Sequence, residues 1–299
     1  MKVHLRYSLG MDNLLLFIIV AVCGVFIGTL SGMFGIGGGT MIIPLLRLAF
    51  GLPVTSCTAT SLFTMIPTSV SGAFSHIRNR DASLQIGLAA GLGGFVFSPL
   101  GVLVGQDLDP RLIITGVALV IIYSAWNMLA PRDEQAAAAT ESGSAAPTAD
   151  SAATAAGTVT EEAVSEHAAP AAQSRLSPAA TGRFVLLGAI AGVLAGILGV
   201  GGGFLIVPVL SRLFRYPMKI AGPASLIAIS LIALPTTAYN IYLGNVYYLQ
   251  GLALICGTVP GARIGAALNT RLPDKQLRRG FAILLACSGV ALLLNELMG

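Results

Sequence analysis

The chain of 299 residues is 55% hydrophobic and only 10% charged, and its mean hydropathy is +0.83. Soluble proteins carry roughly 25% charged residues, so this composition excludes a water-soluble globular protein and indicates an integral membrane protein. The net charge of +4 requires no nucleic-acid partner, because the basic residues gather in short loops, where membrane topology signals belong.

Apolar runs of near-spanning length recur along the chain, since a membrane helix needs roughly 20 residues. They occupy 13–34, 53–75, 84–105, 112–130, 184–199, 220–243, 246–268 and 279–297. Two shorter runs, 39–50 and 203–214, each follow a glycine cluster. The sequence therefore predicts an all-α polytopic membrane protein with about eight long and two short membrane helices.

The two halves of the chain repeat one another. The segment from Gly28 to Gly39, with Pro44, reappears from Gly192 to Gly203, with Pro208, and every glycine and proline maps onto its partner by adding 164. A duplicated hydrophobic chain interrupted by glycine points to a transporter whose binding site lies between its halves. We therefore expect a first membrane repeat at 1–130 and a second at 181–299.

Residues 131–180 have a different composition. They are rich in Ala, Thr, Ser and Glu, hold seven acidic residues against two arginines, and contain no aromatic residue. This composition predicts a disordered acidic linker between the repeats.

The positions of arginine and lysine predict the topology. If each half crosses the membrane an odd number of times, the halves are inverted, and the loops on one side carry twelve basic residues against four on the other. The positive-inside rule then places the twelve, and the linker, in the cytoplasm, with both termini outside the plasma (inner) membrane. A parallel arrangement of four plus four crossings, with the short runs re-entrant, remains open.

The glycine triplets predict breaks in helices. Each glycine costs about 1 kcal/mol relative to alanine in a helix, and a break at membrane depth survives only where it is buried in protein or lines a wet cavity. The short helices that restart at Thr40 and Phe204 present unpaired N–H groups that can face an anion. The candidate substrate-binding residues are therefore Gly37, Gly38, Gly39, Gly201, Gly202 and Gly203. The alternative is a packing seam of small residues, a spacing that Gly28 and Gly32 also match.

Acidic residues are missing from the predicted membrane interior. Outside the linker they are Asp12, Asp81, Asp107, Asp109, Asp274 and Glu296, all at predicted loops or helix ends. Cation carriers normally keep carboxylates inside the membrane, so we expect no metal site and no cofactor. A small anion is the expected substrate, and the lipid bilayer is the expected surroundings.

The repeated glycine pattern, Ala59-Thr60-Ser61-Leu62 with Pro67-Thr68 and His76, and Ala224-Ser225-Leu226 with Pro235-Thr236 and Asn240 together resemble the sulfite exporter TauE/SafE family. The resemblance covers nearly everything except the linker and the extreme N-terminus. It implies a secondary transporter of sulfite, organosulfonates or thiosulfate.

Six polar residues are further candidates. Thr60, Ser61 and Ser225 follow the glycine breaks, and their hydroxyls could donate to sulfonate oxygens, although such residues often bond only to a neighbouring helix. Asn240, also assigned to substrate binding, is the repeat mate of His76, which is the candidate proton-coupling residue. Arg263 could attract the anion or extend to the membrane interface.

Two other function classes remain as alternatives to transport. Thr29-Leu30-Ser31-Gly32 loosely resembles the serine motif of intramembrane proteases, which need a histidine as base. A non-transporting assembly protein is the other alternative. We expect no enzyme activity, and the sequence leaves open the anion, the direction, the coupling ion and the oligomeric state.

Overall fold

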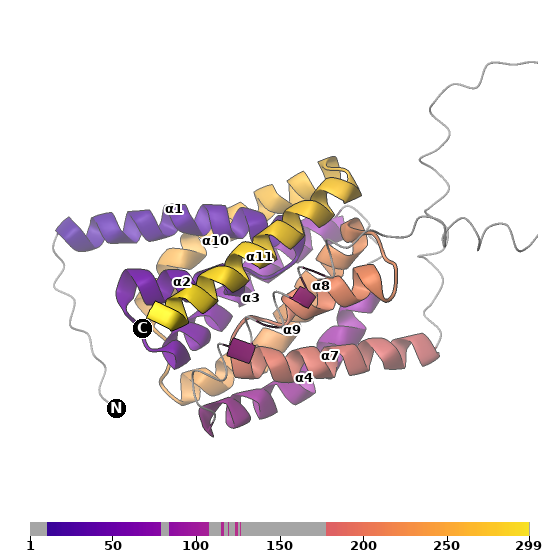
Figure 1. Ribbon diagram of the computed structural model, residues 1–299, viewed down its shortest axis with the longest axis horizontal. Coiled ribbons are helices and arrows are strands. Elements are labelled where there is room, and N and C mark those ends of the chain that lie inside the picture. Colours follow the sequence, from indigo (N-terminus) through magenta and orange to yellow (C-terminus); the bar gives the residue numbers. More distant parts are fainter. Residues whose placement is uncertain are drawn as a thin grey trace, which may run out of the picture. The chain divides into compact units, whose positions relative to one another are not determined.

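The computed structural model describes residues 11–78, 84–107 and 178–298, together with isolated positions between 115 and 126. Every element in these ranges is a helix, as predicted. The helices are α1 (Met11–Phe34), α2 (Gly39–Phe50), α3 (Val54–Arg78), α4 (Leu84–Asp107), α7 (Pro178–Leu198), α8 (Gly203–Arg212), α9 (Met218–Tyr242), α10 (Tyr248–Arg271) and α11 (Asp274–Met298). Figure 1 shows them labelled.

Two predicted segments fall largely outside these ranges. The apolar run 112–130 lies outside the described residues except for isolated positions, and so does the linker as far as residue 177. One compact unit comprises residues 1–129 and 176–299, and residues 130–175 form a separate unit. The fold described below is that of the first unit.

Helix boundaries recur with the sequence offset of 164. α3 and α9 correspond at both ends, and so do α4 and α10. α1 and α7 end at corresponding residues, and the short helices α2 and α8 begin at corresponding glycines. These boundaries of the described helices therefore fall at corresponding positions of the sequence repeat.

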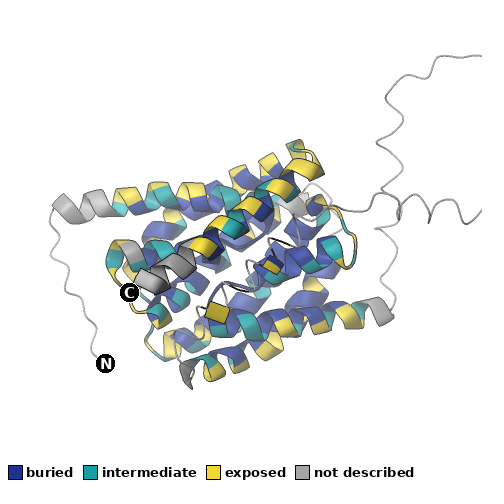
Figure 2. Ribbon diagram, viewed as in Figure 1, coloured by how far each residue is buried: buried dark blue, intermediate teal, exposed yellow. Residues whose placement is uncertain are grey.

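Five of the described helices are long and apolar enough to cross a membrane. The qualifying segments are Phe17–Phe34, Leu84–Gly105, Thr181–Leu198, Met218–Tyr242 and Tyr248–Arg271. Large apolar side chains are exposed on their outer faces, such as Phe26, Val96 and Leu186, each more than 60% exposed. In Figure 2 exposed positions lie along the outer faces of the helices and buried residues lie between the helices. Such faces suit contact with lipid, so the fold is that of a polytopic helical membrane protein.

α3 is more polar than its counterpart. It carries ten serine and threonine residues, against four in α9. α3 is not among the five qualifying segments, and these hydroxyls lower its hydropathy. Most of them are buried, so α3 lies between other helices and its polar face turns away from lipid.

The helices α1, α3 and α10 run parallel to one another, and so do the helices α4, α7 and α9. Along α1 and α10 the facing residues keep the same order: Gly24, Gly28 and Gly32 opposite Leu254, Thr258 and Ala262. α3 also runs parallel to α10. The backbone N–H of Tyr247, at the start of α10, donates to Thr60 near the start of α3, and Arg263 donates to Ser71 further along the two helices. In the second group, Gly93, Gly101 and Gly105 of α4 face Val185, Val193 and Ile197 of α7, and Gly87 and Gly91 face Ala224 and Leu231 of α9.

The two groups run antiparallel to each other, as the contact between α3 and α9 demonstrates. Leu62 and Met65, early in α3, cluster with Ile229 and Ala233 of α9. Further along α3, Ala73 instead clusters with the earlier residues Leu226 and Ile227. α3 and α9 therefore run antiparallel to each other.

The outer glycines form packing seams. A Cβ on Gly28 would lie 2.3 Å from the carbonyl oxygen of Thr258, and one on Gly32 would lie 2.1 Å from that of Ala262. Gly196 of α7 lies equally close to α4. Backbones approach this closely only where side chains are absent, so these glycines join α1 to α10 and α7 to α4.

Candidate functional site

Both glycine clusters break the helical path in the same way. Gly35, Gly37 and Gly38 have φ angles of 78°, 79° and 83°. Their counterparts Gly199, Gly201 and Gly202 have φ angles of 67°, 77° and 70°. Side chains rarely adopt this left-handed conformation. We call residues 35–39 the first break and residues 199–203 the second break.

Each break ends at the N-terminus of a short helix. Gly38 is the N-cap of α2 and Gly202 is the N-cap of α8, and neither N-terminus has a side-chain cap hydrogen bond. The first intrahelical bonds run from Met41 and Ile42 to the carbonyl of Gly38, and the second break repeats this pattern. Preceding amides have no acceptor within the helix, and they carry the positive end of the helix dipole. Each break therefore offers backbone donors of the kind that bind anions.

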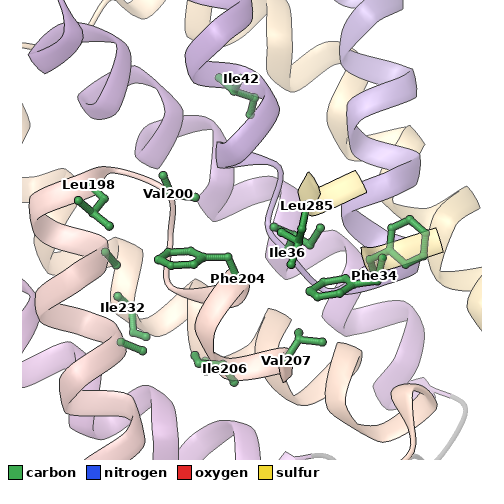
Figure 3. Packing of buried hydrophobic residues seen from close by; sticks show 14 of the residues in the cluster. Phe34, Ile36, Ile42, Leu198, Val200, Phe204, Ile206, Val207, Ile232 and Leu285 are labelled. Atoms are coloured by element: carbon green, nitrogen blue, oxygen red, sulfur yellow. The ribbon is translucent and has the colours of Figure 1, made fainter. Parts of the chain in front are cut away.

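The two breaks touch each other. A Cβ on Gly39 would lie 3.0 Å from the Cα of Val200, and one on Gly203 would lie 2.8 Å from the carbonyl oxygen of Ile36. These two contacts are related by the repeat. Figure 3 shows Phe34 and Ile36 where the chain leaves α1, and Val200 and Phe204 where it passes from α7 into α8. All four side chains are buried, so the breaks meet inside the protein.

Two apolar side chains fill the crossing of the breaks. A Cβ on Gly37 would lie 2.4 Å from the Cε of Met65, and one on Gly201 would lie 1.9 Å from the same atom. Ile229, the repeat mate of Met65, packs beside both glycines. Met65 and Ile229 are fully buried. In this conformation an anion reaches the inner glycines only if these side chains move.

Ser61 and Ser225 hold the breaks in place. The hydroxyl of Ser61 donates to the carbonyl of Gly199 at 2.7 Å, and that of Ser225 donates to the carbonyl of Gly35. Each serine thus binds the break of the other half. The structure brings both predicted residues to the breaks, with their hydroxyl protons directed to carbonyl oxygens.

Thr60 and Asn240 make contacts away from the breaks. The Thr60 hydroxyl accepts a hydrogen bond from the backbone N–H of Tyr247 at 3.0 Å, at the start of α10. The Asn240 amide donates to the carbonyl of Thr236 within α9 at 2.9 Å. Both residues are buried.

Arg263 and His76 also lie apart from the crossing. The Arg263 side chain is exposed, and its Nε donates to the Ser71 hydroxyl of α3 at 3.2 Å. His76 belongs to the last turns of α3, but its side chain lies outside the described residues. Its proton-coupling role remains a prediction.

Two residues near the breaks were missing from the predicted binding set. Met65 fills the crossing, and Ser31 packs near Gly38 with its hydroxyl buried and without a hydrogen-bond partner. The repeat contained a signal for both, because their mates are the non-equivalent residues Ile229 and Ala195. A comparison of polar and flexible residues across the repeat would have singled them out.

Metal ligands are not grouped in the part of the chain that the structure describes. No cluster of three or more His, Cys, Asp or Glu side chains occurs among these residues. The donors gathered at the crossing are backbone amides and hydroxyls, which suit an oxyanion better than a metal ion.

Comparisons with known proteins indicate a membrane transporter. Residues 20–292 match the family model described as sulfite exporter TauE/SafE. The chain is 26% identical to the probable membrane transporter protein MJ0441 of Methanocaldococcus jannaschii, over 96% of this chain and 99% of that protein. It is 25% identical to the probable membrane transporter protein YunE of Bacillus subtilis, over 91% and 96% of the two chains. No solved structure matches it.

Proposed function

The chain belongs to the sulfite exporter TauE/SafE family, and we propose that it is a secondary transporter of small sulfur-containing anions. Its family and its relatives identify it as a membrane transporter. The proposal adds a substrate of the sulfite, organosulfonate or thiosulfate type, a binding site at the crossing of the two breaks, and alternating access. Transport rather than proteolysis is the activity in this proposal.

The observation that carries the proposal is the contact between two uncapped helix N-termini. α2 and α8 begin at corresponding glycines, and their breaks touch at Gly39 and Val200. Two positive dipole ends in one buried place favour a negative charge. Transporters with broken helices use half-helix N-termini in this way for anionic groups.

The surroundings of the crossing support an anion over a cation. The acidic residues of the described helices are Asp12, Asp107, Asp274 and Glu296, each within two residues of a helix end. A cation site inside the membrane would normally need a carboxylate. Backbone N–H groups from Gly37–Gly39 and Gly201–Gly203 instead provide donors without introducing charge.

An inverted relationship between the halves supports alternating access. α3 and α9 correspond by the repeat and pack antiparallel, whereas halves related by an axis along the membrane normal would keep them parallel. The loops 107–115 and 271–279 correspond by the repeat but differ in their number of basic residues, which supports the same arrangement. We therefore place the linker in the cytoplasm and both termini outside.

Alternating access requires that the site can be closed, and in this proposal the side chains of Met65 and Ile229 close it. They fill the crossing and are fully buried. Methionine has three rotatable side-chain bonds and adapts readily to new surroundings. Displacement of Met65 would open the inner glycines to the anion, so movement of this side chain would be the step that admits it.

Thermal unfolding of the purified protein tests this function. We expect sulfite, thiosulfate or sulfoacetate to raise the melting temperature, while acetate and chloride at equal ionic strength do not. A ligand at 100 times its dissociation constant adds about 2.7 kcal/mol of stability. The stabilising anion should then be carried across the membrane of proteoliposomes. Failure of every sulfur-containing anion to stabilise the protein would refute the proposed function.

A further inference from the structure

We propose that the anion site is asymmetric, and that the Ser31 hydroxyl of α1 binds an oxygen of the anion beside the N-terminus of α2. This inference rests on the proposed function and assigns a specificity-determining residue to its site. Three independent features of Ser31 and its surroundings support the assignment.

The first feature is an unsatisfied buried hydroxyl. Ser31 is 2% exposed, and its Oγ has no hydrogen-bond partner. A buried hydroxyl without a partner is costly, and such groups often mark the place of a missing ligand or water. By contrast Thr29, on the same helix, donates its hydroxyl to the carbonyl of Val25 at 2.8 Å. Local bonding to α1 is therefore available to a neighbouring hydroxyl but is not used by Ser31.

The second feature is the place of Ser31. Its Cβ lies 3.6 Å from the position of a Cβ on Gly38, the N-cap of α2. The uncapped amides that follow Gly38 and the Ser31 side chain therefore border the same buried region. A hydroxyl and backbone amides converging on one oxygen atom form the usual set of donors for an oxyanion.

The third feature is a difference in crowding between the glycines of the two breaks. A Cβ on Gly38 would meet no atom closer than 3.3 Å, whereas one on Gly37 would meet Met65 at 2.4 Å and one on Gly201 would meet it at 1.9 Å. A Cβ on Gly202, the counterpart of Gly38, would lie 3.0 Å from the carbonyl oxygen of Ala191. The nearest neighbour beside Gly38 is therefore the side chain of Ile27, which can shift, whereas the nearest neighbour beside Gly202 is a backbone oxygen, which is fixed by its helix.

The repeat sharpens the asymmetry. Ser31 corresponds to Ala195, which is fully buried and has no hydrogen-bond donor in its side chain. The second break lacks the hydroxyl at this position and has a carbonyl oxygen, which repels an anion, close to its N-cap. One anion per chain should therefore bind, with its oxygen at the first break.

The test compares Ser31→Ala with Thr29→Val, using sulfite and thiosulfate as probes. We expect Ser31→Ala to weaken affinity about ten- to a hundredfold, as for the loss of a hydrogen bond to a charged group. Without anion, this variant should melt at the wild-type temperature or higher, because it removes an unsatisfied hydroxyl. Thr29→Val should bind as the wild type does, and titration should give one anion per wild-type chain.

Other outcomes would overturn the assignment. Wild-type affinity in Ser31→Ala, or two equivalent anions per chain, would refute it while leaving the proposed function intact. A lower melting temperature of Ser31→Ala with an unchanged anion-induced shift would mean that the hydroxyl is structural. If the wild type bound neither probe, the proposed function would fail and the role of Ser31 with it.

Discussion

The hydroxyl of Ser61 in α3 donates a hydrogen bond to the carbonyl of Gly199, 138 residues away in the other half of the chain. The repeat places Ser225 against Gly35 in the same way. Each half thus fixes the break of the other, and the two breaks cannot separate unless these bonds break. The serines therefore couple the geometry of the candidate site to the contact between the halves.

Removal of these hydroxyls should loosen the crossing. We expect Ser61→Ala and Ser225→Ala each to lower stability by about 0.6 kcal/mol, and by at most about 1.7, the range measured for interhelical hydrogen bonds in membranes. The double variant should lose more anion affinity than either single variant. Ser230→Ala is the control, because the Ser230 hydroxyl bonds only within its own helix, to Ile227. Equal effects from the control in thermal unfolding would refute the coupling role.

The contact between Gly201 and Met65 predicts a rescue. Gly201→Ala should destabilise the protein, because the residue has a positive φ and the new Cβ, 1.9 Å from the present position of the Met65 Cε, would force that side chain to move. Met65→Ala alone should also destabilise it, by leaving a cavity. In the double variant the clash is removed, so the loss of stability should be smaller than the sum of the single losses. Additive losses in a double-mutant cycle would contradict this packing.

Bulk at the two N-caps should abolish anion binding. Gly38→Leu and Gly202→Leu place a branched side chain where the backbone must meet the ligand, and both positions have a positive φ. The matched control is Gly51→Ala, which has a φ of 61° but nothing within 4 Å of the added Cβ. It imposes backbone strain without filling the site. Normal membrane insertion with lost anion binding is the expected result, and retained affinity in both leucine variants would favour a packing role for these glycines.

Cysteine labelling tests the topology. A single cysteine introduced in the 131–180 linker, on a background without the four native cysteines, should resist membrane-impermeant thiol reagents in intact cells and react after lysis. Cysteines at the two termini should react in intact cells. Labelling of the linker from outside would reverse the assigned orientation. Termini on the cytoplasmic side would contradict the inverted ten-crossing arrangement.

His76 tests proton coupling. His76→Asn copies the residue at the corresponding position, Asn240, and should preserve anion binding. The pH dependence of transport should flatten between about pH 5 and 8, where an ordinary histidine changes its charge. Arg263→Gln, by contrast, should act equally at every pH, because arginine stays protonated. A wild-type pH profile in the His76 variant would remove this residue from the mechanism.

Much of the fold could be predicted because the membrane simplifies the choice of structure. Backbone groups in lipid must be satisfied within the segment, so an apolar run of sufficient length is a helix. The short runs 39–50 and 203–214 were predicted as helices, and α2 and α8 begin at Gly39 and Gly203. Left-handed φ angles at the glycine triplets agree with predicted breaks, since few other residues adopt them.

The candidate site was predicted only in part. The sequence placed Ser61 and Ser225 close to the breaks, but it did not reveal that each would bond to the opposite half. The repeat marks Met65 as different from its mate Ile229, but it does not place Met65 at the crossing, because side chains 136 residues apart, such as Met65 and Gly201, meet only through tertiary packing. Thr60 and Arg263 carried the right chemistry, yet their partners are on the facing segments of α10 and α3.

The sequence by itself determined the membrane setting, the helical segments, the repeat and the two glycine breaks, because these follow from composition and from backbone preferences that act locally. Tertiary structure alone decided that the two breaks touch and that the Ser31 hydroxyl remains without a partner. These features depend on which surfaces pack together across more than a hundred residues. Local preferences carry no information about that choice, since a glycine, serine or methionine in a helix is equally compatible with many neighbours.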